Sequence, residues 1–351
     1  MLNRILSGDL PRSRVLAVLL VVMLIALAFV PVLVPGVKAL NVAAKILIFI
    51  VLVASFDLLL GYTGIVSFAH TMFYGIGAYG VAIASTRMGP GWAAIAVGIV
   101  VALALSFVLA AAIGLFSLRV KAIFFSMITL AVAAAFQTLA SQLSDITGGE
   151  DGLTFKMPEV LSPGFQLTDW FDGKLICYYL LFVVTIVLLL AMLRIVNSPF
   201  GRVLLAIREN EFRAEAIGYR VVVYRTAASV LSALFATLAG AMLAIWLRYN
   251  GPDTSLSFEI MLDVLLIVVI GGMGTIYGAA LGSGIFVVAQ SYLQDLLKLA
   301  SEAASGLPWL AALLSPDRWL LWLGLLFVLS VYYFPTGIVG RLRAARMRLR
   351  S

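Results

Sequence analysis

The chain contains 351 residues, of which 63% are hydrophobic and 12% are charged, and its formal net charge is +7. Soluble domains are about 45–50% apolar and about 25% charged, so this composition excludes a water-soluble globular protein. One cysteine, Cys177, excludes a disulfide framework within the chain, and a single histidine beside it argues against a Cys/His metal site.

Long apolar runs recur along the chain, and a helix needs roughly 20 residues to cross the hydrocarbon layer. The first run follows Arg4, Arg12 and Arg14 but is longer than the apolar part of a signal peptide, and no A-x-A-like cleavage site follows it. We therefore interpret it as the first span. Predicted spans lie at 15–36, 39–60, 91–118, 122–143, 175–196, 224–247 and 318–336.

Two further apolar regions, 62–86 and 262–299, are rich in glycine. Small residues let helices approach closely, and they let backbone line a polar cavity. Both regions therefore predict broken or re-entrant helices.

The distribution of charge predicts the topology. Basic residues gather at the N-terminus, at Arg119 and Lys121, between Arg194 and Arg225, and in the tail 341–350, whereas acidic residues gather in 144–174, 248–263 and 300–318. Basic segments stay in the cytoplasm, so both termini are predicted to be cytoplasmic and the number of spans to be even. Because the basic residues flank apolar runs and form no single polar face, no nucleic-acid partner is expected.

These patterns predict an all-α integral membrane protein, a polytopic bundle of about ten (8 to 10) transmembrane helices. Ten crossings are favoured over eight with a re-entrant hairpin in 262–299. We expect one transmembrane domain over 1–351, with 144–174 as an external segment and 197–220 as a cytoplasmic loop.

The external segment contains DITGGEDGL, whose glycines and acids are typical of turns. It is either a solvated connection or a rim that meets a delivered substrate or a delivery protein.

The cytoplasmic loop has an apolar stripe with mixed charges between its members, which predicts a short helix outside the membrane. Gly218 stands where a helix C-cap is expected. An interfacial helix on anionic lipid is the alternative to docking in a protein groove, and the three acids among the arginines argue mildly against lipid.

Ionisable groups inside apolar runs are costly and are therefore functional candidates. Asp57 and Asp295 are the acids that we identify there, while Lys45 and Lys298 lie close enough to span ends to snorkel. Lys298 is three residues after Asp295, so a local ion pair explains Asp295.

Asp57 stands just before Gly61, where a helix break would free backbone N–H groups, so it is either a cap or a substrate contact. His70 is either a proton relay or a hydrogen-bonded histidine inside the bundle. We find no Ser/His/Asp set, no paired carboxylates and no phosphate-binding loop, so the chain is not expected to be an enzyme or to hydrolyse ATP.

Several segments occur in an order that resembles a known family. They are DLLLGYTGIVSFAHTMFYGIGAY, LRVKAIFFSMITLA, TGGEDGL, SPFGRVLLAIRENEFRAEAIGY, LAGAMLA, VVIGGMGTIYGAALGS and FPTGIVGRLR. The chain resembles the permease subunits of bacterial ATP-binding-cassette importers for branched-chain amino acids, the M-type member of the high-affinity Leu/Ile/Val system, with its urea and amide relatives.

The resemblance implies a multi-pass protein of the bacterial inner membrane without its own ATPase activity or cofactor. Its implied partners are a second, H-type permease subunit, two ATP-binding subunits that hold ATP and Mg²⁺, and a periplasmic substrate-binding protein. The loop that would couple the permease to an ATP-binding subunit matches Gly201, Arg202, Ala206, Arg208, Glu209, Asn210, Glu215, Ala216 and Gly218.

The resemblance also suggests residues for the translocation path or its helix breaks. They are Asp57, Gly61, Tyr62, Gly64, Ser67, His70, Gly75, Tyr79, Gly271, Gly272, Gly274 and Gly278. Many relatives carry Asn in place of Asp57, which is compatible with either an ionised or a protonated acid.

The leading hypothesis is an ATP-driven importer permease for branched-chain or related amino acids. Within this class, urea, amides or small organic acids are alternative substrates. From another class, the alternative is an ion-coupled secondary transporter that uses Asp57, His70 and Asp295.

Overall fold

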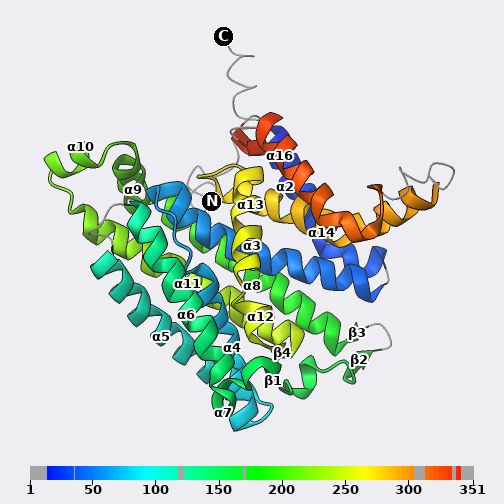
Figure 1. The fold of residues 1–351 in the computed structure, drawn as a ribbon. Coiled ribbons are helices and arrows are strands. Elements are labelled where there is room, and N and C mark those ends of the chain that lie inside the picture. The colour runs from blue at the N-terminus through cyan, green and yellow to red at the C-terminus, as the bar shows by residue number, and fades with distance from the viewer. Residues whose placement is uncertain are drawn as a thin grey trace, which may run out of the picture.

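The computed structural model describes residues 14–34, 36–117, 122–168, 171–303, 313–333 and 337–340. Within these residues the chain is a bundle of long helices (Figure 1). They are α2 (Arg14–Leu33), α3 (Val37–Thr63), α4 (His70–Met88), α5 (Trp92–Ser117), α6 (Ala122–Gln142), α8 (Gly173–Val196), α11 (Val221–Leu247), α13 (Phe258–Gly271), α14 (Ile276–Ala303) and α16 (Trp319–Tyr333).

Short elements connect these helices. The short helices are α7 (Ser144–Thr147), α9 (Pro199–Glu209), α10 (Glu211–Ala216), α12 (Pro252–Ser255), η1 (Gly149–Asp151), η2 (Glu159–Leu161) and η3 (Pro316–Arg318). The strands are β1 (Leu153–Thr154), β2 (Gln166–Thr168), β3 (Phe171–Asp172) and β4 (Tyr249–Asn250), paired antiparallel as β1–β4 and β2–β3.

Eight stretches among the described residues are long and apolar enough to cross a membrane. They are α2, α3, α5, α6, α8, α11, α14 and the stretch Pro252–Gly271 that includes α13. The prediction of an all-α polytopic membrane protein with 8 to 10 spans is confirmed. The favoured count of ten also included α4 and α16. However, α4 is rich in glycine and tyrosine and falls short of an apolar span. The predicted span at 318–336 lies partly outside the described residues, which include α16 from Trp319 to Tyr333.

Helix α3 forms the centre of the bundle, and its side chains are buried without interruption from Ile46 to Leu59. It packs against α11, α14 and α8. Beside it, α4 and α11 approach closely, because a side chain on Gly77 would overlap the Thr237 carbonyl and one on Gly240 would overlap the Tyr74 carbonyl. The predicted use of small residues for close helix packing is thus observed here.

Both glycine-rich regions interrupt helices, as predicted. Helix α3 ends at Gly64, whose φ of 74° is left-handed, and α4 begins at His70. Helix α13 ends before Gly272, with a φ of 113°, and Gly274, with a φ of 77°, lies in the turn to α14. The 28 residues of α14 extend about 42 Å, which favours a crossing helix over half of a re-entrant hairpin.

The predicted external and cytoplasmic segments lie at opposite ends of the bundle. Figure 1 shows α7 and β1 at its lower end and α9 and α10 at its upper end. Within DITGGEDGL, Gly148, Gly149 and Gly152 have positive φ, which confirms the predicted turn, while Leu153 begins β1 and pairs with Asn250 of β4. The predictions for the termini and for Arg119 and Lys121 concern residues outside those described, apart from Arg14, which begins α2.

Candidate functional site

Two capped helices, α9 and α10, form most of the predicted cytoplasmic loop. The Ser198 side chain accepts a hydrogen bond from the Gly201 N–H over 3.4 Å at the start of α9, with Pro199 in the first turn. Asn210 ends α9, and its side chain accepts from the Arg213 N–H over 2.9 Å, which starts α10. The prediction of a single short helix is therefore wrong, because Asn210 acts as the N-cap of a second helix in the middle of the loop.

The helix pair has one face on the bundle and one face open. Leu204 and Ile207 are buried, whereas Phe212 and Ile217 remain 81% and 72% exposed. Among the residues matched to a coupling loop, Gly201 is buried, and Arg202, Ala206, Arg208, Glu209, Asn210, Glu215, Ala216 and Gly218 are exposed. Gly218 follows α10 with a φ of 97°, close to the predicted cap. The open face combines apolar side chains with both signs of charge.

Arg208 connects this helix pair to the membrane bundle. Its guanidinium donates a hydrogen bond to the carbonyl of Gly61, in the last turn of α3. The last carbonyls of a helix lack partners within the helix, so a cation from α9 stabilises this end of α3. A side chain on Gly64 would lie 3.3 Å from the Arg208 stem, so the small residue leaves room for the arginine.

The same end of α3 holds the turn between α13 and α14. The Asp57 Oδ1 atom accepts a hydrogen bond from the Gly274 N–H over 2.8 Å. A side chain on Gly61 would overlap both the Asp57 carboxylate and the Gly274 backbone, so these segments meet because both positions are glycine. We call Asp57, Gly61, Arg208 and Gly274 the Arg208 junction. Asp57 caps a turn 217 residues away and not its own helix break.

His70 connects three helices through one hydroxyl group. Its Nε2 atom lies 2.7 Å from the Ser232 Oγ atom, and the Ser232 hydroxyl donates to the Ser55 carbonyl. Because that hydroxyl donates its only proton to Ser55, we assign Nε2 as a donor to Ser232. The ring also lies edge-on to Phe56, with centroids 4.9 Å apart. This arrangement favours the interpretation of a hydrogen-bonded histidine inside the bundle.

The remaining residues suggested for the path do not all gather at the junction. Tyr62 and Ser67 are buried nearby in sequence, at the end of α3 and in its link to α4. By contrast, Gly75 packs against Leu256, and Tyr79 clusters with Ala140 and Leu256. Gly271 and Gly278 pack against each other within the α13–α14 hairpin, beside Gly272.

Two expectations about charged side chains are wrong. Asp295 forms an ion pair with Lys38 of α3 and not with Lys298. Lys45 does not extend to the end of its span but donates to the Gln290 Oε1 atom over 2.9 Å. Local spacing suggested neither partner, because both contacts join α3 to α14 across more than 240 residues of chain.

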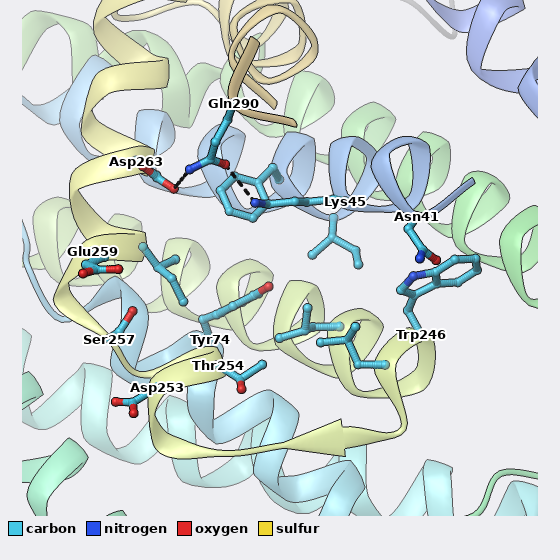
Figure 2. A pocket seen from close by; sticks show the side chains of 15 residues that line it. Asn41, Lys45, Tyr74, Trp246, Asp253, Thr254, Ser257, Glu259, Asp263 and Gln290 are labelled. Carbon is cyan, nitrogen blue, oxygen red and sulfur yellow. Dashed lines mark hydrogen bonds between the residues drawn. The ribbon is translucent and has the colours of Figure 1, made fainter. Parts of the chain in front are cut away.

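Lys45 and Gln290 line a pocket of about 430 Å³ between α3, α4, α11, α13 and α14, with α12 at its edge (Figure 2). The Gln290 Nε2 atom donates to the Asp263 Oδ2 atom over 3.2 Å, so one amide connects a lysine to an aspartate. The lining also contains Asn41, Asp253, Thr254, Ser257, Glu259, Tyr74, Trp246, Leu247 and the apolar side chains of Ile48, Phe49, Leu243 and Ile260.

Residues suggested for the path from the sequence do not line this pocket. Sequence reasoning missed Asp263, which we placed in the external segment 248–263, and it explained Lys45 as a snorkelling side chain. The available signal was that both ionisable groups stand within apolar stretches, since α3 and the stretch Pro252–Gly271 each form a candidate span.

Comparisons with known proteins agree on one class of membrane protein. The family model described as branched-chain amino acid transport system / permease component matches residues 38–331. The high-affinity branched-chain amino acid transport system permease protein LivM of Salmonella typhimurium strain LT2 is 26% identical over 76% of this chain and 66% of its own length. LivM of Escherichia coli strain K12 is 26% identical over 86% of this chain and 73% of its own length.

An archaeal protein is similar to the same degree. The probable branched-chain amino acid transport permease protein LivM of Methanocaldococcus jannaschii is 27% identical over 69% of this chain and 67% of its own length. The chain thus matches about two thirds to three quarters of the length of these relatives. No solved structure gives a significant match.

Proposed function

Because the chain belongs to the branched-chain amino acid transport permease family, we propose that it is the membrane permease subunit of an ATP-driven importer. It moves branched-chain or related amino acids from the periplasm to the cytoplasm across a bacterial inner membrane. It carries no ATPase activity and holds no cofactor, while ATP and Mg²⁺ bind to partner subunits. The partners are a second permease subunit, two ATP-binding subunits and a periplasmic substrate-binding protein.

One observation supports this proposal above the others, the hydrogen bond from Arg208 of α9 to Gly61 of α3. It joins an open helix pair outside the bundle to a helix end inside it. Phe212 and Ile217, both more than 70% exposed on the same helix pair, supply apolar surface for an ATP-binding subunit. An ion-coupled transporter has no use for such a surface.

The mechanism follows from this connection. When ATP closes the pair of ATP-binding subunits, α9 moves with the subunit that holds it. Arg208 carries the movement to the end of α3, and Gly274, bound to Asp57 of α3, carries it to α13 and α14. Small shifts at such packed contacts switch a bundle between discrete states, here between inward and outward access.

The proposal is tested by ATP-driven uptake of tritiated leucine into proteoliposomes that contain the whole complex and its binding protein. Phe212→Asp should abolish uptake and co-purification of the ATP-binding subunits, because it places a charge in an apolar contact. Ile146→Asp is the matched control. Ile146 is 44% exposed on α7 at the opposite end of the bundle, and this variant should still co-purify with the ATP-binding subunits.

Two results would contradict the proposal. Leucine uptake that continues with ATP-binding subunits unable to hydrolyse ATP would indicate ion-coupled transport. ATP-driven uptake of urea without uptake of leucine would change the substrate but keep the importer mechanism.

A further inference from the structure

We propose that the pocket lined by Lys45, Gln290 and Asp263, called the Lys45 pocket below, binds a zwitterionic amino acid with an apolar side chain during translocation. Lys45 binds the α-carboxylate of the ligand, and Asp263 binds its α-ammonium group. This inference rests on the proposed function and extends it, because it assigns the permease its own recognition site for the substrate.

The pocket holds two opposite charges that are separated by one amide group. Gln290 accepts from the Lys45 ammonium over 2.9 Å and donates to the Asp263 carboxylate over 3.2 Å. The lysine and the aspartate are therefore held apart by one amide group and do not form a direct ion pair (Figure 2). An α-amino acid also places its carboxylate and ammonium groups on either side of one carbon atom, so it can bridge the same two side chains.

The wall of the pocket is partly apolar. Ile48, Phe49, Leu243 and Ile260 give it an apolar surface beside the polar side chains of Lys45, Gln290 and Asp263. Ligand sites are typically apolar, with a few polar groups that orient the ligand, and their volumes are about 300–1,000 Å³. The pocket of about 430 Å³ has both properties, which suits an aliphatic side chain attached to a charged head.

The partly buried charges of the pocket also favour a zwitterion. Asp253 and Glu259 are exposed to solvent, so the half-buried charges in the lining are one lysine and one aspartate, Lys45 and Asp263. A purely anionic ligand would leave Asp263 without an opposite charge, and a purely cationic ligand would leave Lys45 without one. A neutral amide would leave both charges of the pocket without an opposite charge, which is costly in a partly buried site. A zwitterion satisfies both.

The pocket shares helices with the Arg208 junction. Its exposed acids are Asp253 in α12 and Glu259 in α13, and α12 follows the strand β4 that pairs with β1 of the external segment. Lys45 and Asp57 lie about 18 Å apart along α3. Helices α3, α13 and α14 line the pocket and also meet at the junction. A movement that begins at α9 therefore reaches the helices that hold the ligand.

The experiment measures binding to the whole purified complex in nanodiscs, without the binding protein. Leucine is compared by scintillation proximity with isocaproate, which lacks the ammonium group, and with isoamylamine, which lacks the carboxylate. Both analogues should bind about 10- to 100-fold more weakly than leucine, as expected for the loss of a hydrogen bond to a charged group.

Substitutions then assign each charge. Lys45→Met should weaken leucine binding about 10- to 100-fold and leave isoamylamine binding unchanged, and Asp263→Asn should weaken leucine binding and leave isocaproate binding unchanged. Lys38→Met and Asp295→Asn are matched controls. They remove an exposed ion pair between α3 and α14, two of the helices that line the pocket, at residues that do not line it. Neither control should alter leucine binding.

A pocket-filling variant covers the case in which a charge variant fails to fold. Ile260→Trp changes no charge and should remove leucine binding by occupying the pocket. Undetectable leucine binding to the wild-type complex, or equal binding by wild type, Lys45→Met and Ile260→Trp, would overturn the inference. If ATP-driven leucine uptake nevertheless persists, the proposed function stands alone. If leucine binds but uptake ignores ATP, the pocket stands and the proposed function fails.

Discussion

The carboxylate of Asp57 in α3 accepts a hydrogen bond from the backbone N–H of Gly274, in the turn between α13 and α14, over 2.8 Å. Asp57 is 1% exposed, so its carboxylate has little access to water and needs hydrogen-bond donors such as this N–H group. The contact joins two glycine-rich helix ends that are 217 residues apart in the chain. Arg208 meets the same helix end from outside the bundle.

Replacing Asp57 distinguishes a hydrogen-bond acceptor from a charge. Asp57→Asn keeps a side-chain oxygen toward Gly274 and should retain stability and leucine uptake. Asp57→Ala leaves the N–H unsatisfied and should lower the free energy of unfolding by about 1–3 kcal/mol. Thermal unfolding of the purified complex and uptake assays measure both effects. If Asp57→Asn abolishes uptake in a stable complex, the negative charge itself is required.

Gly274→Ala tests the close approach at the junction. At a φ of 77° an alanine is strained by about 1–2 kcal/mol. Its Cβ would also lie 3.0 Å from the Gly61 carbonyl oxygen. We expect a lower unfolding temperature and reduced uptake. Gly36→Ala is the control, because Gly36 has a φ of −173° and no atom near its missing side chain. Equal effects of the two substitutions would refute a special role for Gly274.

Arg208→Ala should uncouple ATP hydrolysis from transport. Under the proposed function, the variant should still bind the ATP-binding subunits through the exposed Phe212 and Ile217, but its hydrogen bond to Gly61 is lost. We expect near-normal co-purification and ATPase activity, together with at least about tenfold slower leucine uptake, which corresponds to about 1.4 kcal/mol. Arg87→Ala, in the last turn of α4, provides the control. Unchanged uptake per ATP hydrolysed in the Arg208 variant would show that movement reaches the bundle by another route.

Asn210→Ala tests the division between α9 and α10. Loss of the side-chain acceptor for the Arg213 N–H should cost about 1 kcal/mol and loosen α10. We expect weaker co-purification of the ATP-binding subunits, and Asn210→Asp should restore it because aspartate is an equally good N-cap. Asn197→Ala removes an exposed side-chain hydrogen bond to the Leu193 carbonyl at the end of α8 and serves as control. Full binding by Asn210→Ala would mean that the cap is dispensable for docking.

Much of the fold could be predicted from composition and local pattern. Apolar runs of about 20 residues predict membrane helices because the bilayer offers no partner for an open backbone, and the runs at 15–36 and 39–60 became α2 and α3. The glycine-rich regions predicted helix breaks, and α3 and α13 end before Gly64 and Gly272, whose positive φ angles favour glycine. Family membership follows from the ordered segments together with the match over residues 38–331.

The sites were less accessible to sequence reasoning, because they depend on which helices become neighbours. Local spacing predicted Lys298 as the partner of Asp295, but the partner is Lys38. It also predicted that Lys45 extends to the end of its span, whereas Lys45 donates a hydrogen bond to Gln290 in the pocket. Hydrophobic periodicity specifies that a segment is a helix and which residues are apolar, but it does not specify a neighbour more than 200 residues away. The sequence by itself determined the class of the protein, its helices and its glycine breaks. Only the packing of α3, α9, α13 and α14 decided that Arg208 meets Gly61 and that Lys45 faces Asp263 across one amide, since those contacts exist only once the helices are assembled.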